Sequence, residues 1–275
     1  MLLGRLGLVL LVLGSCQARS DSAAAPAASP APMKPATPRA PEHLKVKVLA
    51  SMHHDPAAYT QGLVWQAGTL YESTGQYGAS SLRQVNPQTG EVLRFLPIPP
   101  RYFAEGLALV GDRLLQLTWK EGTTFVWTAA DFKPQGELQY SGEGWGLCWD
   151  GSRLVMSDGS DHLTFRDPRT FASLGGVDVT LEGRPLLEIN ELECVDDAVW
   201  ANVWQTDQIV RIDPATGVVT GVVDAAGLLT PQEMEKAEVL NGIAWKPETK
   251  TFLITGKYWP KLFEATFVGT NEEKP

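Results

Sequence analysis

A short phrase occurs five times along this 275-residue chain. Each copy has a polar or aromatic residue, then Gly or a substitute for it, a short apolar segment, a turn and a second apolar run. The copies are TQGLVWQAGTLY from Thr60, AEGLALVGDRLLQL from Ala104, GWGLCWDGSRLVMS from Gly144, NELECVDDAVWANV from Asn190 and LNGIAWKPETKTFLIT from Leu240. The Gly position falls at 62, 106, 146, 191 and 242, and repeats of this length with strand-like contents are typical of propeller blades.

The segments between the copies have the plan of antiparallel sheets. In the first repeat and again in the fourth, three further strand-like segments follow the initial strand, separated by turns that contain Gly or Pro. They are 70–75, 82–86 and 92–96, then 198–204, 209–213 and 218–223. Each repeat is therefore predicted to form a sheet of four strands.

The ends of the chain predict how the array of sheets closes. The last repeat stops one strand short after Phe267, whereas an unassigned strand at 43–52 precedes the first repeat. We expect this N-terminal strand to complete the last blade, because closure removes an exposed sheet edge. A short helix at 231–238 accounts for the longest spacing. The prediction is an all-β fold, a five-bladed β-propeller over residues 43–270 closed by the N-terminal strand.

The N-terminus has the features of an export signal. Arg5 precedes an apolar run at 6–13, too short to span a bilayer, and the tetrapeptide Leu-Gly-Ser-Cys ends at Cys16. This tetrapeptide resembles the bacterial lipobox, whose cysteine becomes the lipidated first residue of the mature protein; the alternative is an ordinary signal peptide cut near Ala18. We expect residues 1–16 to be a lipoprotein signal, and the protein to be exported and lipid-anchored on the periplasmic side of a bacterial membrane.

Composition adds a tether and excludes one class of partner. Residues 17–42 are rich in Ala, Pro and Ser and have few large apolar side chains, which predicts a disordered tether. The formal net charge of −9 and the pI near 5.0 disfavour phosphate binding, so we expect no nucleic-acid partner. Membrane contact is expected only through the lipid anchor, and a closed acidic ring predicts a monomer.

Two cysteines remain after the signal, and an exported domain permits a disulfide between them. When the repeats are aligned on Leu147 and Leu192, Cys148 lies one step after its leucine and Cys194 two steps after. Alternate residues of a strand face opposite ways, so this register favours two buried thiols over a bond, without excluding it.

Polar and aromatic residues gather at the heads of the first strands and at the ends of the strands that follow. In a ring these positions surround a channel mouth, and a mouth lined by indoles, carboxylates and a lysine is suited to a small ligand. The alternative for each tryptophan is simple packing between blades. The residues are Gln61, Glu105, Trp145, Asn190, Glu191 and Asn241, followed by Trp119, Asn202, Trp204, Lys257 and Trp259.

Nine segments in order along the chain resemble the plant and bacterial glutaminyl-peptide cyclotransferases, over about residues 46–267. This resemblance implies a five-bladed propeller enzyme, an acyltransferase that converts the N-terminal glutaminyl residue of peptides or proteins to pyroglutamyl and releases ammonia. The segments are TQGL at Thr60, LYESTGQYGASSLRQV at Leu70, FAEGLAL at Phe103, LTWKEG at Leu117, EGWGL at Glu143, INELE at Ile189, ANVWQTDQIVRIDPATG at Ala201, LNGIAW at Leu240 and TGKYWPKLFE at Thr255.

The resemblance and the chemistry together assign roles. A carboxylate must move a proton from the attacking amine to the leaving nitrogen, and fixed donors must meet the charge on the amide oxygen. Glu105 is the expected proton shuttle, with Glu191 second and also a candidate for binding Lys257 or the substrate amine. The expected donors are Lys257, Asn190 and Gln61, and the expected walls around the glutamine side chain are Trp145, Trp204 and Trp119.

No cofactor is expected, because the four histidines have no metal-ligand spacing and the resemblance is to the metal-independent type. The segment His53-His54-Asp55-Pro56 is interpreted as a surface turn, with a metal site as the minor alternative. Two other functions remain open. One is a propeller that binds a peptide or sugar without catalysis, and the other is a five-bladed glycosidase, which needs two carboxylates across a cleft.

Overall fold

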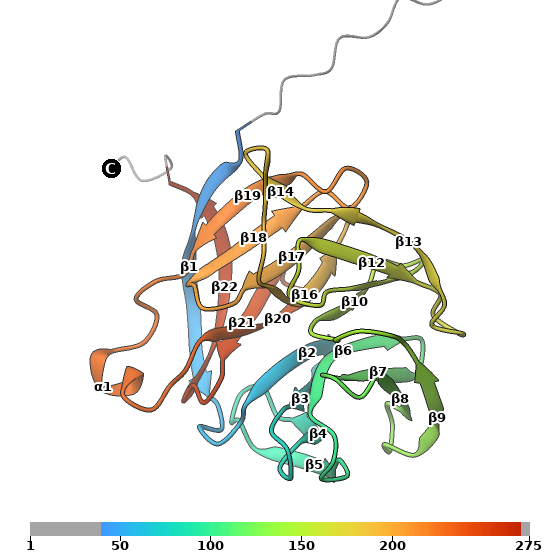
Figure 1. The fold of residues 1–275 in the computed structure, drawn as a ribbon. Helices are drawn as coiled ribbons and strands as arrows, with labels where there is room; N and C mark the ends of the chain where they lie inside the picture. Colours follow the sequence, from blue (N-terminus) through green and yellow to red (C-terminus); the bar gives the residue numbers. More distant parts are fainter. Residues whose placement is uncertain (1–39, 271–275) are drawn as a thin grey trace, which may run out of the picture. The chain divides into compact units, whose positions relative to one another are not determined.

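The computed structural model describes residues 40–270, and within them the protein is all-β apart from one short helix (Figure 1). The signal at 1–16, the lipidation of Cys16 and nearly all of the tether at 17–42 lie outside the described residues. No helix in the described part of the chain has the length and apolar character needed to cross a bilayer.

Three separate sheets follow one another along the chain, each with four antiparallel strands in sequence order. The first has β2 (Thr60–Gln66), β3 (Thr69–Thr74), β4 (Ser81–Val85) and β5 (Val92–Pro97). The second has β6 (Ala104–Val110), β7 (Arg113–Thr118), β8 (Thr123–Thr128) and β9 (Pro134–Gln139). The third has β10 (Leu147–Trp149), β11 (Leu154–Met156), β12 (His162–Arg166) and β13 (Ser173–Asp178).

The remaining strands form one hairpin and one larger sheet. The hairpin is β14 (Thr180–Leu181) with β15 (Arg184–Pro185). The larger sheet has eight strands in the order β16-β17-β18-β19-β1-β22-β21-β20. Its members are β1 (Glu42–His53), β16 (Ile189–Val195), β17 (Ala198–Val203), β18 (Gln208–Ile212), β19 (Val219–Asp224), β20 (Leu240–Lys246), β21 (Thr251–Gly256) and β22 (Lys261–Gly269).

Strand β1 joins the four strands β16 to β19 to the three strands β20 to β22 within this larger sheet. It pairs antiparallel with β22 over most of its length, and only its first residues, Glu42 to Lys45, pair in parallel with β19. The predicted strand at 43–52 therefore forms and lies beside the last strands of the chain. The helix α1 (Pro231–Met234) is shorter than the predicted 231–238, and a capping box between Thr230 and Glu233 begins it.

Local sequence explains the repeated phrase. The two-residue turn between β2 and β3, Ala67-Gly68, has positive φ at both positions, as tight hairpins require. The Gly of the phrase is needed for close approach, since a Cβ on Gly62 would lie 2.6 Å from the backbone nitrogen of Leu107, and one on Gly106 equally close to that of Leu147. First strands of consecutive sheets thus touch through their backbones.

Glu191 occupies the same position in the fourth copy and replaces the contact by hydrogen bonds. Its two carboxylate oxygens accept the backbone N–H groups of Leu63, at 3.2 Å, and Ile243, at 2.8 Å. The Glu191 side chain thereby links β16, which begins the fourth repeat, to β2 and β20, which begin the first and the last repeat.

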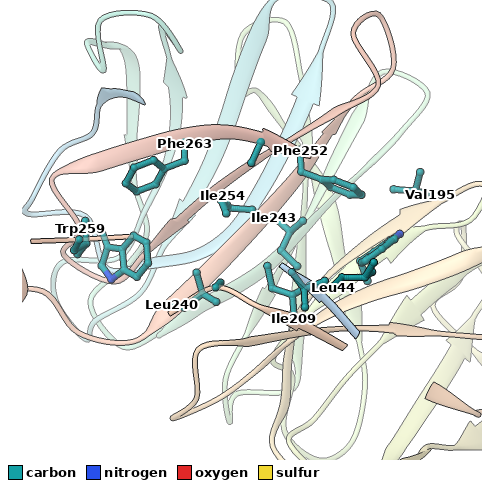
Figure 2. Packing of buried hydrophobic residues seen from close by; sticks show 14 residues of the cluster. Leu44, Val195, Ile209, Leu240, Ile243, Phe252, Ile254, Trp259 and Phe263 are labelled. Carbon is teal, nitrogen blue, oxygen red and sulfur yellow. The ribbon is translucent and has the colours of Figure 1, made fainter. Parts of the chain in front are cut away.

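Among residues 40–270, four of the five clusters of buried apolar side chains join groups of strands that follow one another along the chain, and the fifth joins the first group to the last. In that cluster Leu63 and Leu70 of the first sheet pack with Leu253 and Leu262 of β21 and β22. Figure 2 shows a second cluster, in which Leu44 and Ile209 pack with side chains of β20 and β21.

The two cysteines are bonded, so the interpretation as free thiols is wrong. Cys148 of β10 and Cys194 of β16 form a disulfide with Cα atoms 5.5 Å apart. The two strands belong to neighbouring sheets that pack face to face, so bonded residues must lie on opposite faces of their own sheets. The one-residue offset between the aligned repeats supplies this arrangement, since strand alternation disfavours a bond only where the two cysteines must share a face.

Candidate active site

A cavity of about 190 Å³ lies where the first strands β2, β6 and β16 begin, and Trp145, just before β10, also lines it. This volume is below the range of about 300–1,000 Å³ that is usual for drug-sized ligands, and suits a single amino-acid residue. Most of its lining is aromatic, with one carboxyl, one ammonium and two amide side chains. The lining residues are Tyr59, Gln61, Phe103, Glu105, Trp119, Trp145, Asn190, Trp204 and Lys257.

Glu105 is the carboxyl group of the cavity. It lies at the start of β6 and is only 4% exposed. Burial raises its pKa well above the usual value, and the negative charges of Glu143 and Glu121 act in the same direction, while Lys257 and a hydrogen bond from Gln61 oppose them. A carboxyl group with a raised pKa can both accept and return a proton near neutral pH.

Lys257 follows β21 and places its ammonium group against the aromatic part of the cavity. Its Nζ lies 4.8 Å from the centre of the Tyr59 ring, a cation–π contact. Burial lowers the pKa of Lys257, while the charges of Glu105 and Glu238 raise it. Two hydrogen bonds hold the backbone of Lys257: its N–H donates to the carbonyl oxygen of Val239, and its carbonyl oxygen accepts the N–H of Glu238.

The side-chain amide of Gln61 is held from behind. Asn241 Nδ2 donates to Gln61 Oε1 at 3.2 Å and to the carbonyl oxygen of Thr60 at 2.9 Å. With its oxygen occupied, Gln61 presents its NH₂ group towards Glu105. The sequence placed Asn241 among the pocket residues, whereas in the structure it supports the pocket from outside its lining.

Two tryptophan walls share one anchor. The indole N–H groups of Trp119 and Trp145 both donate to Oε2 of Glu143, at 2.7 and 3.0 Å. The Nζ atom of Lys120 lies 3.5 Å from the other carboxylate oxygen of Glu143 and 3.8 Å from the ring centre of Trp119. Trp204 packs edge to face on Trp145, with ring centres 5.6 Å apart. The three indoles are therefore fixed relative to one another.

Asn190 is the second amide side chain of the lining, at 2% exposure. Its carbonyl oxygen accepts a hydrogen bond from Ser157 Oγ at 2.6 Å, which holds the backbone in place. Its side-chain Oδ1 is buried and accepts no hydrogen bond from the described residues. This oxygen is available to an N–H group of a bound ligand.

Seven of the eight predicted site residues line the cavity, namely Glu105, Lys257, Asn190, Gln61, Trp145, Trp204 and Trp119. Glu191 does not line it, because its carboxylate is used by the two backbone N–H groups of Leu63 and Ile243.

Tyr59 and Phe103 line the cavity and were not predicted from the sequence. A signal for them exists, since each stands two residues before the polar residue of its repeat, Gln61 or Glu105. Alternate residues of a strand share a face, so this spacing brings the ring and the polar group to the same side. The two rings also contact each other, with centres 6.0 Å apart.

In the described part of the chain no group of three or more His, Cys, Asp and Glu side chains is arranged to hold a metal ion. The prediction of a surface turn at 53–56 is wrong for His54, which is 2% exposed and hydrogen-bonded to Glu72. The groups that line the cavity are one carboxyl, one ammonium, two amides and aromatic walls.

The sequence matches the family model described as glutamine cyclotransferase over residues 15–267. It is 40% identical over 225 residues to the glutaminyl-peptide cyclotransferase of Arabidopsis thaliana, covering 80% of this chain and 70% of that protein. The structure is similar to the crystal structure of Myxococcus xanthus glutaminyl cyclase, with a TM-score of 0.77 and 42% identity, covering 84% of this chain and all of the other.

Proposed function

Because the chain belongs to the glutamine cyclotransferase family, we propose that its cavity converts N-terminal glutaminyl residues of peptides or proteins to pyroglutamyl residues and releases ammonia. The observation that carries this assignment is the meeting of Glu105 and Lys257 in a small cavity with aromatic walls. Such a cavity holds one glutamine residue in a folded conformation, so that its amine and its side-chain amide lie together.

The reaction requires proton movement as well as proximity. The substrate amine begins as an ammonium group and ends as the lactam N–H, so it loses two protons. One goes to the leaving amide nitrogen, which departs as ammonia, and the other is released to solvent. Glu105 accepts a proton from the amine and delivers one to the leaving nitrogen, and its raised pKa suits both steps.

Bond making and breaking occur at the side-chain amide carbon. The amine forms a new C–N bond there, negative charge develops on the amide oxygen, and the bond to the leaving nitrogen then breaks. The Lys257 ammonium and the Gln61 NH₂ group are the proposed donors to that oxygen. The free Oδ1 of Asn190 favours a different role from the donor role predicted from the sequence, namely accepting an N–H of the substrate amine.

The indoles of Trp119, Trp145 and Trp204 confine the glutamine side chain. By excluding water they strengthen the electrostatic effect of Lys257 and limit hydrolysis of the amide to glutamate. Tyr59 and Phe103 complete the aromatic lining.

A five-bladed propeller is the arrangement that we propose for the sheets. It is supported by the five groups of four strands, if the eight-stranded sheet is divided at the short parallel pairing of β1 with β19. The apolar clusters support it too, since four of them join consecutive groups and the fifth joins the last group to the first. In this arrangement β1 completes the blade of β20, β21 and β22.

The sequence of the N-terminus supports a proposal for the cellular location of the protein. The protein is exported, anchored by lipid at Cys16 on the periplasmic side of the membrane, and carries its catalytic domain at 43–270 as a monomer on the tether at 17–42. Labelling with a radioactive fatty acid, compared between wild type and Cys16→Ala, tests the anchor.

The function is tested by ammonia release from a Gln-initiated dipeptide by the purified protein, with a chelator present. Cyclisation lowers the substrate mass by the mass of ammonia, whereas hydrolysis to Glu raises it. We expect turnover that persists in chelator and is lost in Glu105→Gln, while that variant still binds the dipeptide in calorimetry. A folded wild type without turnover contradicts the enzyme and favours a binding propeller.

A further inference from the structure

The turn between β1 and β2 contains a buried charged group that the mechanism above does not use. His54 is 2% exposed and does not line the cavity. The turn nevertheless leads directly to Tyr59 and Gln61, which do line it. The contacts of His54 therefore bear on how two parts of the site are held together.

Both ring nitrogens of His54 face acceptors. Nδ1 lies 2.7 Å from the carbonyl oxygen of Trp259, and Nε2 lies 2.9 Å from Oε1 of Glu72. A carbonyl oxygen and a carboxylate only accept, so both nitrogens carry a proton and the ring is an imidazolium. Burial lowers the pKa of His54, but the charge and hydrogen bond of Glu72, the Trp259 carbonyl and Asp55 raise it overall.

Glu72 connects this imidazolium to the strand that carries Gln61. Its Oε1 also accepts the hydroxyl of Thr60 at 2.7 Å, and Thr60 directly precedes Gln61. Arg83 stands 4.0 Å from the other oxygen of Glu72 and 2.8 Å from Asp55. The buried carboxylate is thus surrounded by partners on the first sheet and on the turn.

On its other side, His54 reaches the segment that carries Lys257. Trp259 is two residues after Lys257, and the backbone N–H of His54 donates to the carbonyl oxygen of Pro260 at 3.0 Å. Further along the same two segments, Tyr258 N–H donates to the carbonyl oxygen of Ala58 at 2.7 Å. Residues 54–59 and 257–260 are therefore bonded to each other at three points.

We infer that His54 is a positioning residue for Lys257: the ring joins Glu72 in the first sheet to the Trp259 carbonyl and so fixes the segment 257–260 against the strand that carries Gln61. The inference rests on the proposed function, because it assigns Lys257 a part in the reaction. It gives the His-His-Asp-Pro segment a role different from metal binding or a plain surface turn.

A double-mutant cycle tests whether His54 acts through Lys257. We expect His54→Gln to lower kcat by about 10²-fold, which is the loss caused when a catalytic group is displaced by about 1 Å. KM should change less than about threefold. In a Lys257→Met background the same substitution should cause no further loss of kcat, because the effects of substitutions at two residues that act together are not additive. Equal losses in both backgrounds, or no loss in either, overturn the inference.

Lys246→Met is the matched control. Lys246 forms a largely buried ion pair with Glu264 at 2.8 Å, on the same group of strands as Lys257 but away from the cavity. We expect this variant to be less stable than wild type and to keep its kcat. A loss of kcat in Lys246→Met as large as in His54→Gln makes the effect one of stability, which overturns the inference.

Hydrogen exchange gives a measurement that does not depend on turnover. In His54→Gln the backbone amides of Lys257 and Tyr258 should exchange at least about tenfold faster, while peptides from the third sheet and from strands β16 to β19 are unchanged. Glu72→Gln should give the same local pattern and replaces His54→Gln if that variant does not fold. A uniform increase over the whole domain, or protection at 257–258 equal to that in Lys246→Met, contradicts the positioning role even if the enzyme proves inactive.

Discussion

Glu105 and Lys257 face the same cavity, and each favours the charged form of the other. The positive charge of Lys257 lowers the pKa of Glu105 against the effect of burial, and the negative charge of Glu105 raises the pKa of Lys257 against the same effect. Neither group has its ordinary pKa, and the protonation of one depends on the other. This coupling gives the activity a dependence on pH that substitution can shift.

Lys257→Met should move the acid limb of the pH profile to higher pH. Without the ammonium group the pKa of Glu105 rises further, and Glu105 must be ionised to accept a proton from the substrate amine. We therefore expect that, on acidification, kcat/KM of the variant begins to fall at a higher pH than kcat/KM of the wild type. The check is kcat/KM for a Gln-initiated dipeptide across about pH 5 to 9. If the acid limb of the kcat/KM profile has the same pH midpoint in the variant and in wild type, the charge of Lys257 does not affect the pKa of Glu105.

Substitutions of Glu143 should separate its two effects. Glu143→Gln keeps an oxygen that accepts the indole N–H groups of Trp119 and Trp145 but loses the charge that raises the pKa of Glu105. We expect its KM to remain near wild type and its acid limb to move to lower pH.

Glu143→Ala loses the acceptor as well as the charge. Two hydrogen bonds of about 1 kcal/mol each then no longer fix the walls, so KM should rise about tenfold or more. Steady-state kinetics of both variants over pH provide the measurement. If alanine and glutamine give the same KM, Glu143 does not position the walls.

The disulfide between Cys148 and Cys194 should contribute strongly to stability. It joins residues 46 apart in sequence, and the chain-entropy model assigns about 4 kcal/mol to a closed loop of that length. We expect reductant to lower the urea midpoint of wild type towards that of Cys148→Ala/Cys194→Ala. The double variant should itself be insensitive to reductant. A wild-type midpoint unchanged by full reduction contradicts a stabilising bond.

Glu193 should make the fold less stable as the pH rises. Burial raises its pKa to about 8, partly offset by the hydrogen bond from the N–H of Trp245. Between its unfolded value, near 4.3, and about 8, the folded state holds a proton that the unfolded state has lost, so the free energy of unfolding falls with rising pH.

Glu193→Gln removes this group and should flatten the decline, although Glu191, whose pKa burial also raises, keeps part of it. Urea unfolding of wild type and variant at several pH values across the window measures the slope. A variant that declines as steeply as wild type excludes Glu193 as a source.

Much of the fold and of the site was determined by the sequence itself. The strands lie where the alternating segments predicted them, as at β4 (Ser81–Val85) and β18 (Gln208–Ile212), because residue pattern and turn residues act locally. The repeated phrase also placed Gln61, Glu105 and Asn190 at equivalent strand heads, and equivalent positions of similar sheets meet at one place.

Only the tertiary structure decided which side chains face one another across different sheets. It used the Glu191 carboxylate for the backbone of β2 and β20, bonded Cys148 to Cys194, and buried His54 between Glu72 and the Trp259 carbonyl. These contacts join residues from 18 to 205 positions apart along the chain. They depend on how whole sheets pack, a property that no local pattern of residues encodes.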